Sequence, residues 1–326
     1  MAKLEKLMAL SVVSETTQGT AVAPAATDFI PLIEKPTVKP IVEIMQRHNF
    51  REALGRLPFS TGWSYSDVSF NVEWLGASAT NTAYAPIDTL FKACGMTVTG
   101  GSAGADWTYA LSSTNISNHL GPATACTLNY FVDGLKHIVQ GFVGSWKIIG
   151  EAGQTPMIAF TGKALYTAVT DTAIPTTTFT HNTIIPKMKS AALLVDNAAV
   201  GYCQKVEIDL GNKFEFVPDV GSTNGLAGFR ITDREPKASI NPEMGTVAAY
   251  DYWAKFIAGT AISSSSKGLQ CIYGNGARNF STVTCPQVQI ADAKYGTRNG
   301  VVTLDVDLQI NESSENDGLN IVVDNA

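Results

Sequence analysis

The sequence predicts a mainly β protein, a β-sandwich or barrel, built as two similar domains that each carry one short helix. Apolar and polar residues alternate in several segments, including 205–210 and 302–310. This alternation is typical of strands that bury one face and expose the other, as in antiparallel sheets packed face to face. Turn signals such as Asp133-Gly134 separate the runs and indicate hairpins. A chain of 326 residues with 45% hydrophobic residues can bury a core in each of two domains.

Short segments recur in the same order in the two parts of the chain. Val42-Glu43-Ile44 matches Phe214-Glu215-Phe216, and Ser69–Glu73 matches Ser239–Glu243. A short helix, a hairpin and a closing strand then follow in each part; the matched segments are 90–95 with 254–259, 130–138 with 272–280, and Met157–Thr161 with Val301–Asp305. We interpret this order as a duplication, with a first domain at residues 1–166 and a second at 191–326. The alternative is two unrelated β-rich domains.

Each domain is predicted to contain one helix that ends at a glycine. Pro86 suits a first helical turn, and Gly95 can adopt the left-handed conformation that ends a helix. The apolar residues of this segment fall on one face, as do those before Gly259. These residues are Ile87, Leu90, Phe91 and Cys94 in the first domain and Tyr250, Trp253, Phe256 and Ile257 in the second.

Two segments stand outside the repeated pattern. Residues 96–121 of the first domain have no match in the second and are rich in Gly and Ser, which indicates an insertion loop with room for a small hairpin. Residues 167–190 are rich in Thr and Pro and poor in helix-forming residues. They are predicted to form an extended linker or an edge strand between the domains.

Composition and motifs argue against an enzyme. The formal charge is −6, so the chain lacks the basic surface that holds nucleic acid through its phosphates. The four histidines and five cysteines show no metal-ligand spacing, and neither a nucleophile elbow nor a phosphate-binding Gly-Lys-Ser/Thr loop occurs. Asp305 and Asp307 could serve a glycosidase, but a solvated strand face explains them more simply. No enzyme, cofactor or metal site is therefore predicted.

Neither a signal peptide nor a membrane-spanning segment is expected. Glu5 interrupts the charged start of the chain, and the apolar run that follows is short, so the N-terminus is interpreted as mature. No apolar run reaches the length of a transmembrane helix.

Several segments resemble the major tail tube proteins of long, non-contractile phage tails. They are "ETTQGTAVAPAATDFIPLIEK", "SFNVEW", "PIDTLFKACG" and above all the C-terminal "GLQCIYGNGARNFSTVTCPQVQIADAKYGTRNGVVTLDVDLQI". The likeness covers nearly the whole chain in diffuse patterns of strand and turn residues. It implies a β-sandwich flanked by a helix, in a structural virion protein that polymerises into stacked rings around a channel for DNA.

The duplication changes the ring that the resemblance implies. Most such proteins carry one tube domain and form six-membered rings, whereas two tandem tube domains would build a pseudo-six-fold ring from three copies. A ring of six chains is the alternative. The implied partners are further copies of the chain, a tape-measure protein, a tail terminator and distal tail proteins, with viral DNA passing through unbound. Assembly is expected in the host cytoplasm, and the final location is the tail of the virion.

Two sets of residues are expected to serve the tube. Four carboxylates are candidates for a negative channel wall, which would not retain duplex DNA: Glu73, Glu243, Asp305 and Asp307. The loops Met45–Pro58 and Val217–Gly228 are longer than ordinary hairpin connections and are expected to join stacked rings. The side chains expected to make those contacts are Arg47, Arg51, Arg56, Asp219 and Asn224.

Two other classes remain open from the sequence alone. A tandem β-sandwich of a surface lattice or fibre would be expected to carry a signal peptide. A carbohydrate-binding sandwich should expose clustered aromatic residues, for which Trp63, Tyr65 and Trp74 are candidates. Trp74 shares a strand face with Phe70 and Val72, however, and is expected in the core.

Overall fold

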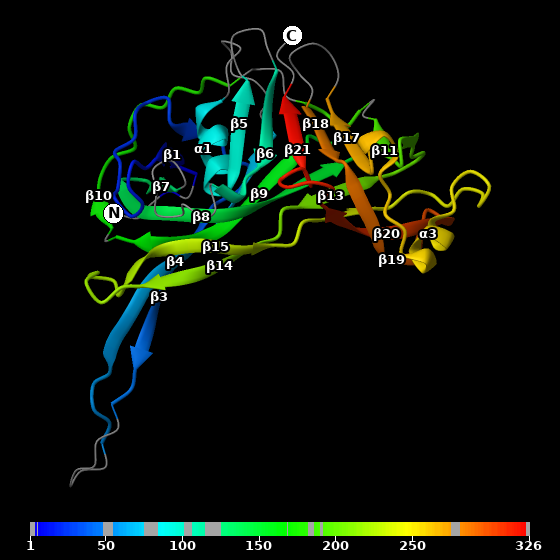
Figure 1. Cartoon of the computed structure of the whole chain (residues 1–326). Coiled ribbons are helices and arrows are strands. Elements are labelled where there is room, and N and C mark those ends of the chain that lie inside the picture. Colours follow the sequence, from blue (N-terminus) through cyan, green and yellow to red (C-terminus); the bar gives the residue numbers. More distant parts are fainter. Residues whose placement is uncertain are drawn as a thin grey trace.

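A computed structural model gives the structure of the protein and confirms the mainly β fold. It describes residue 4 and residues 6–47, 55–74, 84–100, 106–114, 125–167, 169–181, 186–189, 192–274 and 281–323. All strand pairs in these residues are antiparallel, and they are arranged as two layers with helix α1 beside the upper one (Figure 1). No helix in the described part of the chain is long and apolar enough to cross a membrane.

The larger sheet forms the lower layer in Figure 1 and has twelve strands among the described residues. Its main path runs β19-β20-β16-β13-β8-β7-β1-β2, and β9, β4 and β3 branch from β8 in that order, as does β10. The strands are β1 (Met8–Ser14), β2 (Phe29–Ile30), β3 (Thr37–Met45), β4 (Ser60–Glu73), β7 (Cys126–Val132), β8 (Leu135–Glu151), β9 (Met157–Tyr166), β10 (Thr170–Asp171), β13 (Lys205–Asp209), β16 (Lys237–Ile240), β19 (Gln287–Arg298) and β20 (Val301–Asn311).

The second sheet has seven strands in the described residues, in the order β12-β11-β17-β18-β21-β6-β5. Its strands are β5 (Met96–Gly100), β6 (Trp107–Leu111), β11 (Leu193–Val195), β12 (Ala198–Ala199), β17 (Leu269–Tyr273), β18 (Ser281–Cys285) and β21 (Asn320–Val323). A separate hairpin is formed by β14 (Asn212–Pro218) and β15 (Leu226–Arg234). The remaining elements are α1 (Ala85–Ala93), α3 (Tyr252–Ala258) and a 3₁₀ turn at Ser264–Ser266.

One hydrophobic core lies between the sheets and draws on both parts of the chain. Trp74 is buried in it, as predicted, and its indole N–H donates to the Ser281 hydroxyl over 2.8 Å. Leu304 and Leu308 face the same core from β20. Because first-half and second-half side chains interdigitate, the two halves share one buried interior.

Both predicted helices are present, but they differ in burial. Helix α1 buries five of its residues, and Gly95 after it has a φ of +81°. Helix α3 starts with a cap in which the Asp251 carboxylate accepts the Ala254 N–H, and it ends at Gly259 in the left-handed region. No residue of α3 is buried, and Ile257 of its predicted apolar face is 83% exposed. Tyr250, Trp253 and Phe256 of the same face are partly buried and pack against the core, so the predicted face is covered except at Ile257.

The two halves pair their strands in the same order. In the first half, neighbouring strands follow the order β1-β7-β8-β9-β4-β3. In the second half, the order is β11-β17-β18 in one sheet and β19-β20-β16-β13 in the other. Strands β18 and β19 follow each other in the chain across Pro286 and together correspond to the long β8. The long hairpin β3–β4 has a counterpart in β13–β14 paired with β15–β16. The same strand order thus occurs twice in the chain.

The cross-strand partners in the sheet show which residues of the first half are equivalent to which residues of the second. Ser69 lies opposite Thr161, as Ser239 lies opposite Asp307. Glu73 pairs with Met157, and Glu243 bridges Thr303. These pairs align Met157 with Thr303, so the predicted match of Met157 with Val301 is wrong by two positions. The register of each closing strand is set by its pairing with β4 or β16, which lie far away in the sequence, so local patterns do not contain it.

Two connections fasten the halves together. Strand β8 pairs with β13, which places Lys147 opposite Asp209 and Ile148 opposite Ile208. The predicted hairpin in the insertion is formed by β5 and β6, and β6 pairs with the C-terminal strand β21. Residues 101–105 and 115–121 of that insertion lie outside the described residues. In the predicted linker, β10 pairs with β8 and the described residues 172–180 have no assigned strand, while 168, 182–185 and 190 lie outside the description.

The hairpin β3–β4 leaves the body of the molecule and projects downward in Figure 1, whereas β14–β15 lies along the lower sheet. Gly211 makes the bend between β13 and β14 with a φ of +66°, and a Cβ there would lie 2.1 Å from the Glu235 carbonyl oxygen. Beyond the bend, the β14–β15 hairpin packs Phe229 and Leu226 against Val143 and Leu165 of the first half. One hairpin is therefore docked and the other is free.

Candidate assembly surfaces

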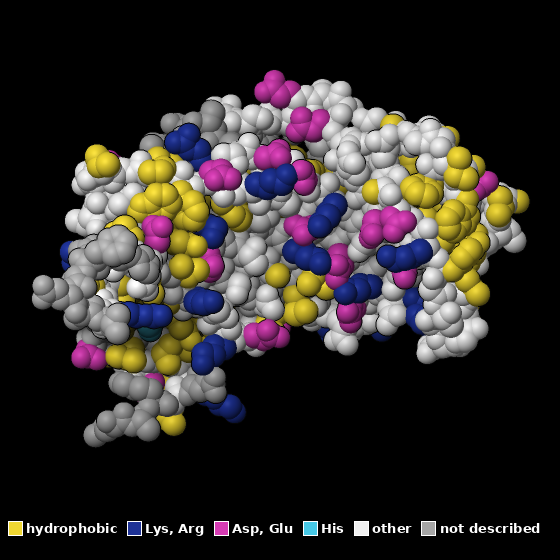
Figure 2. Space-filling view, turned by 90° about the horizontal axis from the view of Figure 1, so that it is seen from below, with side chains coloured by type: hydrophobic (Ala, Val, Ile, Leu, Met, Phe, Trp, Pro, Cys, Tyr) yellow, Lys and Arg dark blue, Asp and Glu magenta, His cyan; other side chains and the backbone are white. Residues whose placement is uncertain are grey.

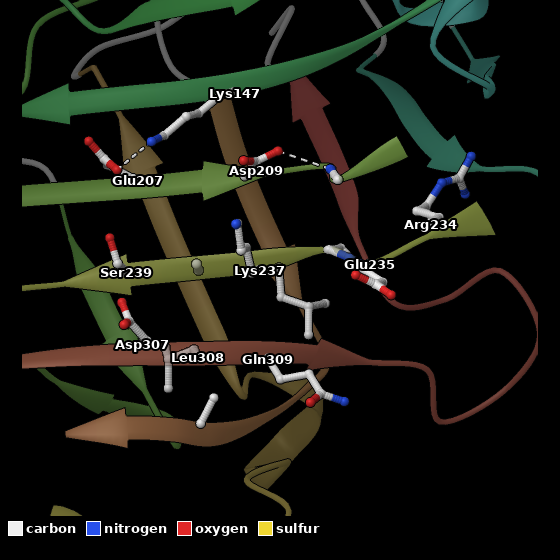
Figure 3. Close-up of a pocket in the computed structure, with 15 residues that line it drawn as sticks. Lys147, Glu207, Asp209, Arg234, Glu235, Lys237, Ser239, Asp307, Leu308 and Gln309 are labelled. Carbon is white, nitrogen blue, oxygen red and sulfur yellow. Dashed lines mark hydrogen bonds and ion pairs between the residues drawn. The ribbon is translucent and has the colours of Figure 1, made fainter. Parts of the chain in front are cut away.

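The outward face of the larger sheet carries interleaved charges. Figure 2 shows Lys and Arg side chains alternating with Asp and Glu over the middle of this face. A shallow hollow of about 720 Å³ lies there between β8, β13, β16 and β20, lined by side chains that include Lys147, Glu207, Lys237 and Asp307 (Figure 3). The alternation of strand residues produces this face, because Ile208, Ala238 and Leu308 point to the core from the same strands.

Glu207 is the centre of this charged field. Its carboxylate pairs with the Lys147 ammonium at 2.6 Å and the Lys205 ammonium at 2.5 Å. Burial raises the pKa of Glu207, but the hydrogen bonds from the two lysines outweigh it and lower the pKa below the usual value. The carboxylate therefore stays ionised and holds two cations against the sheet.

The four predicted wall carboxylates all project from this outward face. Glu73 follows the buried Val72 on β4, and Asp305 and Asp307 alternate with buried residues on β20. Glu243 follows β16, and its carboxylate pairs with the Arg298 guanidinium at 3.0 Å. The lysines between them give the face a mixed charge rather than a uniformly acidic one.

The predicted ring-contact loops differ in their surroundings. Arg47 and Arg56 are exposed on the projecting hairpin, and Arg51 lies outside the described residues. Asp219 is exposed in the β14–β15 loop, where its carboxylate accepts the Gly221 N–H. Asn224 is engaged within the chain, because its carbonyl accepts the Ser64 N–H over 3.3 Å.

The projecting hairpin exposes apolar side chains that its counterpart buries. Val42 and Ile44 on β3 are 45% and 53% exposed. The ladders match Ile44 with Phe214 and Val42 with Asn212, so the predicted match of Val42 with Phe214 is wrong by two positions. Phe214 and Phe216 of β14 pack against the cluster under the first half. The exposed apolar side chains make this hairpin a candidate interaction surface.

The aromatic residues considered for carbohydrate binding do not form an open platform. Trp74 is buried, and Trp63 packs against Phe216 with ring centroids 5.8 Å apart. Tyr65 also contacts Phe216, at 5.1 Å. These contacts explain the residues as a seam between the two hairpins.

Among the described residues, four strands of the larger sheet have a single neighbouring strand: β2, β3, β10 and β19. Sequence patterns did not reveal that the two long ones, β3 and β19, lie at edges. In the described residues, β3 pairs only with β4, and β19 pairs along its length only with β20. Tyr295 on β19 is 64% exposed although it points to the core side of the sheet. Unpaired edges are sites where another strand can add. The alternating pattern of a strand carries no mark of whether it has one neighbour or two.

The titratable and cysteine side chains of the described residues are arranged as follows. The described part of the chain contains no group of three or more His, Cys, Asp or Glu residues placed to hold a metal ion. The five cysteines are free, and four of them are buried.

The comparison with protein families gives one match. The family model described as phage tail tube protein matches residues 6–310. No curated protein sequence matches the chain.

Proposed function

Since the chain belongs to the phage tail tube protein family, and is thus a structural protein of the virion tail, we propose that it polymerises into stacked rings whose bore passes the viral DNA. The observation that carries the proposal is the pair of unpaired edges on one twelve-stranded sheet, β3 and β19. Long unpaired edges are places where further strands can add, and a ring in which β19 of one copy joins β3 of the next pairs both of them. This role is not enzymatic.

Three chains form each ring in this proposal. The repeated strand order supports it, because each chain then supplies two equivalent wall segments, one from residues 1–166 and one from 191–326. Heterologous contacts close into a ring when the rotation per contact divides a full turn, which for six segments is about 60°. Residues 167–190 connect the two segments within a chain.

The outward face of the larger sheet lines the bore in this proposal. Glu73 and Glu243 occupy matching ladder positions, so three chains place six such carboxylates at one level of the wall. Asp305 and Asp307 add charge beside them. Lys147 and Lys205 on this face are each paired with Glu207, so these two lysines are poorly placed to hold phosphates.

The hairpin β3–β4 reaches the neighbouring ring. It projects from the body, it exposes Val42 and Ile44, and it carries Arg47, Arg51 and Arg56 in its loop. Arginine suits such an interface because its planar fork bonds a carboxylate through two parallel contacts. Asp219, exposed in the loop of the docked hairpin, is proposed as one such carboxylate on the adjacent ring, and Asn224 supports the base of the projecting hairpin through Ser64.

Partners follow from this arrangement. A tape-measure protein occupies the bore during assembly, a terminator covers the last ring, and distal tail proteins hold the first one. Assembly takes place in the host cytoplasm before the tail joins the virion. DNA passes without specific binding.

Negative-stain electron microscopy and mass photometry of the concentrated protein test the proposal. Rings or tubes are expected, with ring masses that are multiples of three chains. Rings of six chains would contradict the trimer, and a protein that stays monomeric at every concentration and forms no tube would contradict the proposed function.

A further inference from the structure

The junction between the two halves of one chain is a strand pair with a defined register. Ile148 of β8 lies opposite Ile208 of β13, and both side chains are fully buried. On the outward face, Lys147 lies opposite Asp209. The Leu210 N–H continues the ladder by donating to the Trp146 carbonyl over 3.0 Å.

The ladders identify which residues of the open edge β19 correspond to this part of β8. Ser145 pairs with Thr161 in the first half, and Asp292 pairs with Asp307 in the second. Because Thr161 and Asp307 are equivalent, Ser145 corresponds to Asp292. Two residues after these, Lys147 corresponds to Lys294, and three residues after them Ile148 corresponds to Tyr295. Tyr295 pairs with Leu304 as Ile148 pairs with Ile158.

The same comparison identifies the counterparts of β13 on the other open edge. Glu207 pairs with Ser239, and Thr37 pairs with Ser69. Because Ser239 and Ser69 are equivalent, Glu207 corresponds to Thr37. The next residues, Ile208 and Asp209, therefore correspond to Val38 and Lys39. The two strands that meet inside the chain thus have equivalents at the two free edges of the sheet.

Exposure supports the idea that these edges are covered in the assembly. Ile148 is fully buried because β13 lies beside it, whereas its equivalent Tyr295 is 64% exposed. Val301 and Val302, at the same end of the sheet, are 46% and 50% exposed. Val302 was predicted to face the core with Leu304, but the core stops short of it at this edge.

On this basis, and resting on the proposed ring, we infer that the contact between chains copies the contact within the chain. Strand β19 of one copy pairs with β3 of the next, antiparallel, with Tyr295 opposite Val38 and Lys294 opposite Lys39. The partner of each edge is a second copy of this chain. Every junction of the ring then has the same geometry, which is the condition for closure after three chains.

The edge of β3 is protected against other strands. In β13 the N–H groups at alternate positions point to β8, as the bond from Leu210 shows. The matching positions of β3 are Pro36, Val38 and Pro40, of which only Val38 has an N–H. A proline at these positions keeps a free edge from joining foreign strands. In the inferred register, the backbone carbonyls of this edge of β3 can still accept hydrogen bonds from the N–H groups of β19.

One row of the inferred contact is electrostatically unfavourable by itself. Lys39 lies opposite Lys294, where the internal junction has Asp209 opposite Lys147. Asp67 and Asp305 lie opposite the two lysines on the neighbouring strands β4 and β20. The Asp67 carboxylate pairs with the Lys163 ammonium at 2.9 Å, and the Lys294 ammonium lies 3.7 Å from the Asp292 carboxylate. The row therefore keeps an excess of positive charge, and the contact depends on the apolar side for its stability.

A disulfide test locates the contact directly. Lys39→Cys combined with Lys294→Cys places thiols on two exposed positions that become direct neighbours only in the inferred register, where opposite Cα atoms lie about 4.5 Å apart in a non-hydrogen-bonded pair. Oxidation should give covalent dimers and trimers on a non-reducing gel, and reduction should remove them. The matched control is Lys39→Cys with Asp292→Cys, which moves one thiol two residues along the same strand, about 7 Å away. The unsubstituted chain controls for its own five cysteines.

The outcomes separate this inference from the proposed function. Cross-linked trimers from the first pair, with few or none from the control, support the inferred register. Tubes that form normally but yield no cross-link at positions 39 and 294, or yield more in the control, overturn the inference and leave the tube function in place. Absence of both rings and cross-links at every protein concentration would overturn both.

Discussion

Ser64 and Asn224 join the two long hairpins of the molecule. The Ser64 N–H donates to the Asn224 carbonyl over 3.3 Å, and the Ser64 hydroxyl donates to the Asn224 side-chain oxygen over 3.4 Å. Gly225 follows with its Cα beside the Trp63 ring, where a Cβ would lie 2.9 Å from the ring. The docked hairpin thus supports the projecting one at its base and leaves its far end free to reach another ring.

Shortening Met45–Pro58 to a four-residue turn should abolish tubes without unfolding the subunit. The shortened hairpin keeps its base contacts, so the β-type circular dichroism spectrum should be unchanged, and single rings should still form. Electron microscopy and mass photometry check this. A variant with Arg47→Gln and Arg56→Gln, in which the length is kept, tests whether charge or reach is needed. Long tubes from the shortened protein would show that the loop takes no part in stacking.

Val38→Pro should block ring formation while leaving the subunit folded. This change removes the one N–H that the edge presents between Pro36 and Pro40, and proline is tolerated on an edge strand where the N–H points away from the neighbouring strand. The matched variant Pro40→Leu restores the residue found at the equivalent Leu210 and adds a donor, so rings should form at lower protein concentration. Sedimentation velocity measures both. Rings from Val38→Pro at the concentration of the unsubstituted chain would contradict the strand pairing.

Lys39→Gln should strengthen the contact between chains. The substitution removes the like charge opposite Lys294, and such cross-strand pairs contribute about 0.2–1 kcal/mol. Rings should therefore appear at up to about five-fold lower protein concentration, since about 1.4 kcal/mol corresponds to a factor of ten. A higher concentration requirement would mean that Lys39 makes a favourable contact in the ring and would argue against this register.

Glu15 should make the stability of the subunit depend on pH. Burial raises the pKa of Glu15, although hydrogen bonds from the Gly141 N–H, the Thr127 hydroxyl and the Gly19 N–H oppose the shift. Because the folded pKa lies above the ordinary value of 4.5, the folded state binds the proton more tightly. Stability is therefore lost as pH rises from below 4.5 through the folded pKa.

Glu15→Gln isolates this effect, since it cannot titrate. Urea unfolding at pH 4 and pH 7 should show that the free energy of unfolding of the unsubstituted chain, relative to the variant, is smaller at pH 7. A relative free energy that grows with pH would mean that the ionised carboxylate is the favoured form. Both proteins must be monomeric in this measurement, because ring formation would add its own stabilisation.

Replacing Glu73 and Glu243 by lysine should make the tube retain DNA. The substitutions put six cations at one level of the proposed bore, and neutralising phosphates releases counterions with a log–log salt slope of about −0.9 per phosphate. Fluorescence anisotropy with a short duplex should show salt-dependent binding to the variant tubes. Glu312→Lys with Glu315→Lys, in an exposed loop before β21, is the control with an equal change in charge. Equal binding by both variants would argue that Glu73 and Glu243 do not face the bore.

Local sequence patterns predicted those parts of the fold that depend on neighbouring residues in the chain. Pro86 and Gly95 delimited the first helix, Trp74 followed its strand face into the core, and the insertion contains a hairpin. The register of the closing strands was wrong because it depends on pairing with β4 and β16, which are distant in sequence. The sequence did not predict that Ile148 is buried and Tyr295 exposed. Both are apolar residues of alternating strands, and only the presence of a neighbouring strand distinguishes them.

The candidate surfaces were predicted less completely. The outward direction of the four wall carboxylates follows from alternation, but the pairing of Glu207 with Lys147 and Lys205 depends on β8 and β13 meeting across the two halves. That pairing joins segments distant in sequence, so no local pattern contains it. The same holds for Asn224, which was expected between rings and is bonded to Ser64 within the chain.

The pairing of β6 with β21 has a consequence for how the chain folds. Strand β21 is formed by Asn320–Val323, at the end of the described chain, yet it lies between β18 and β6 and carries Ile321 into the shared core. During synthesis, the seven-stranded sheet cannot be completed until Asn320–Val323 has left the ribosome. Contacts between such distant segments slow folding, because a long loop must close before they form. A chain cut short before Asn320 should therefore remain incompletely folded and fail to enter rings.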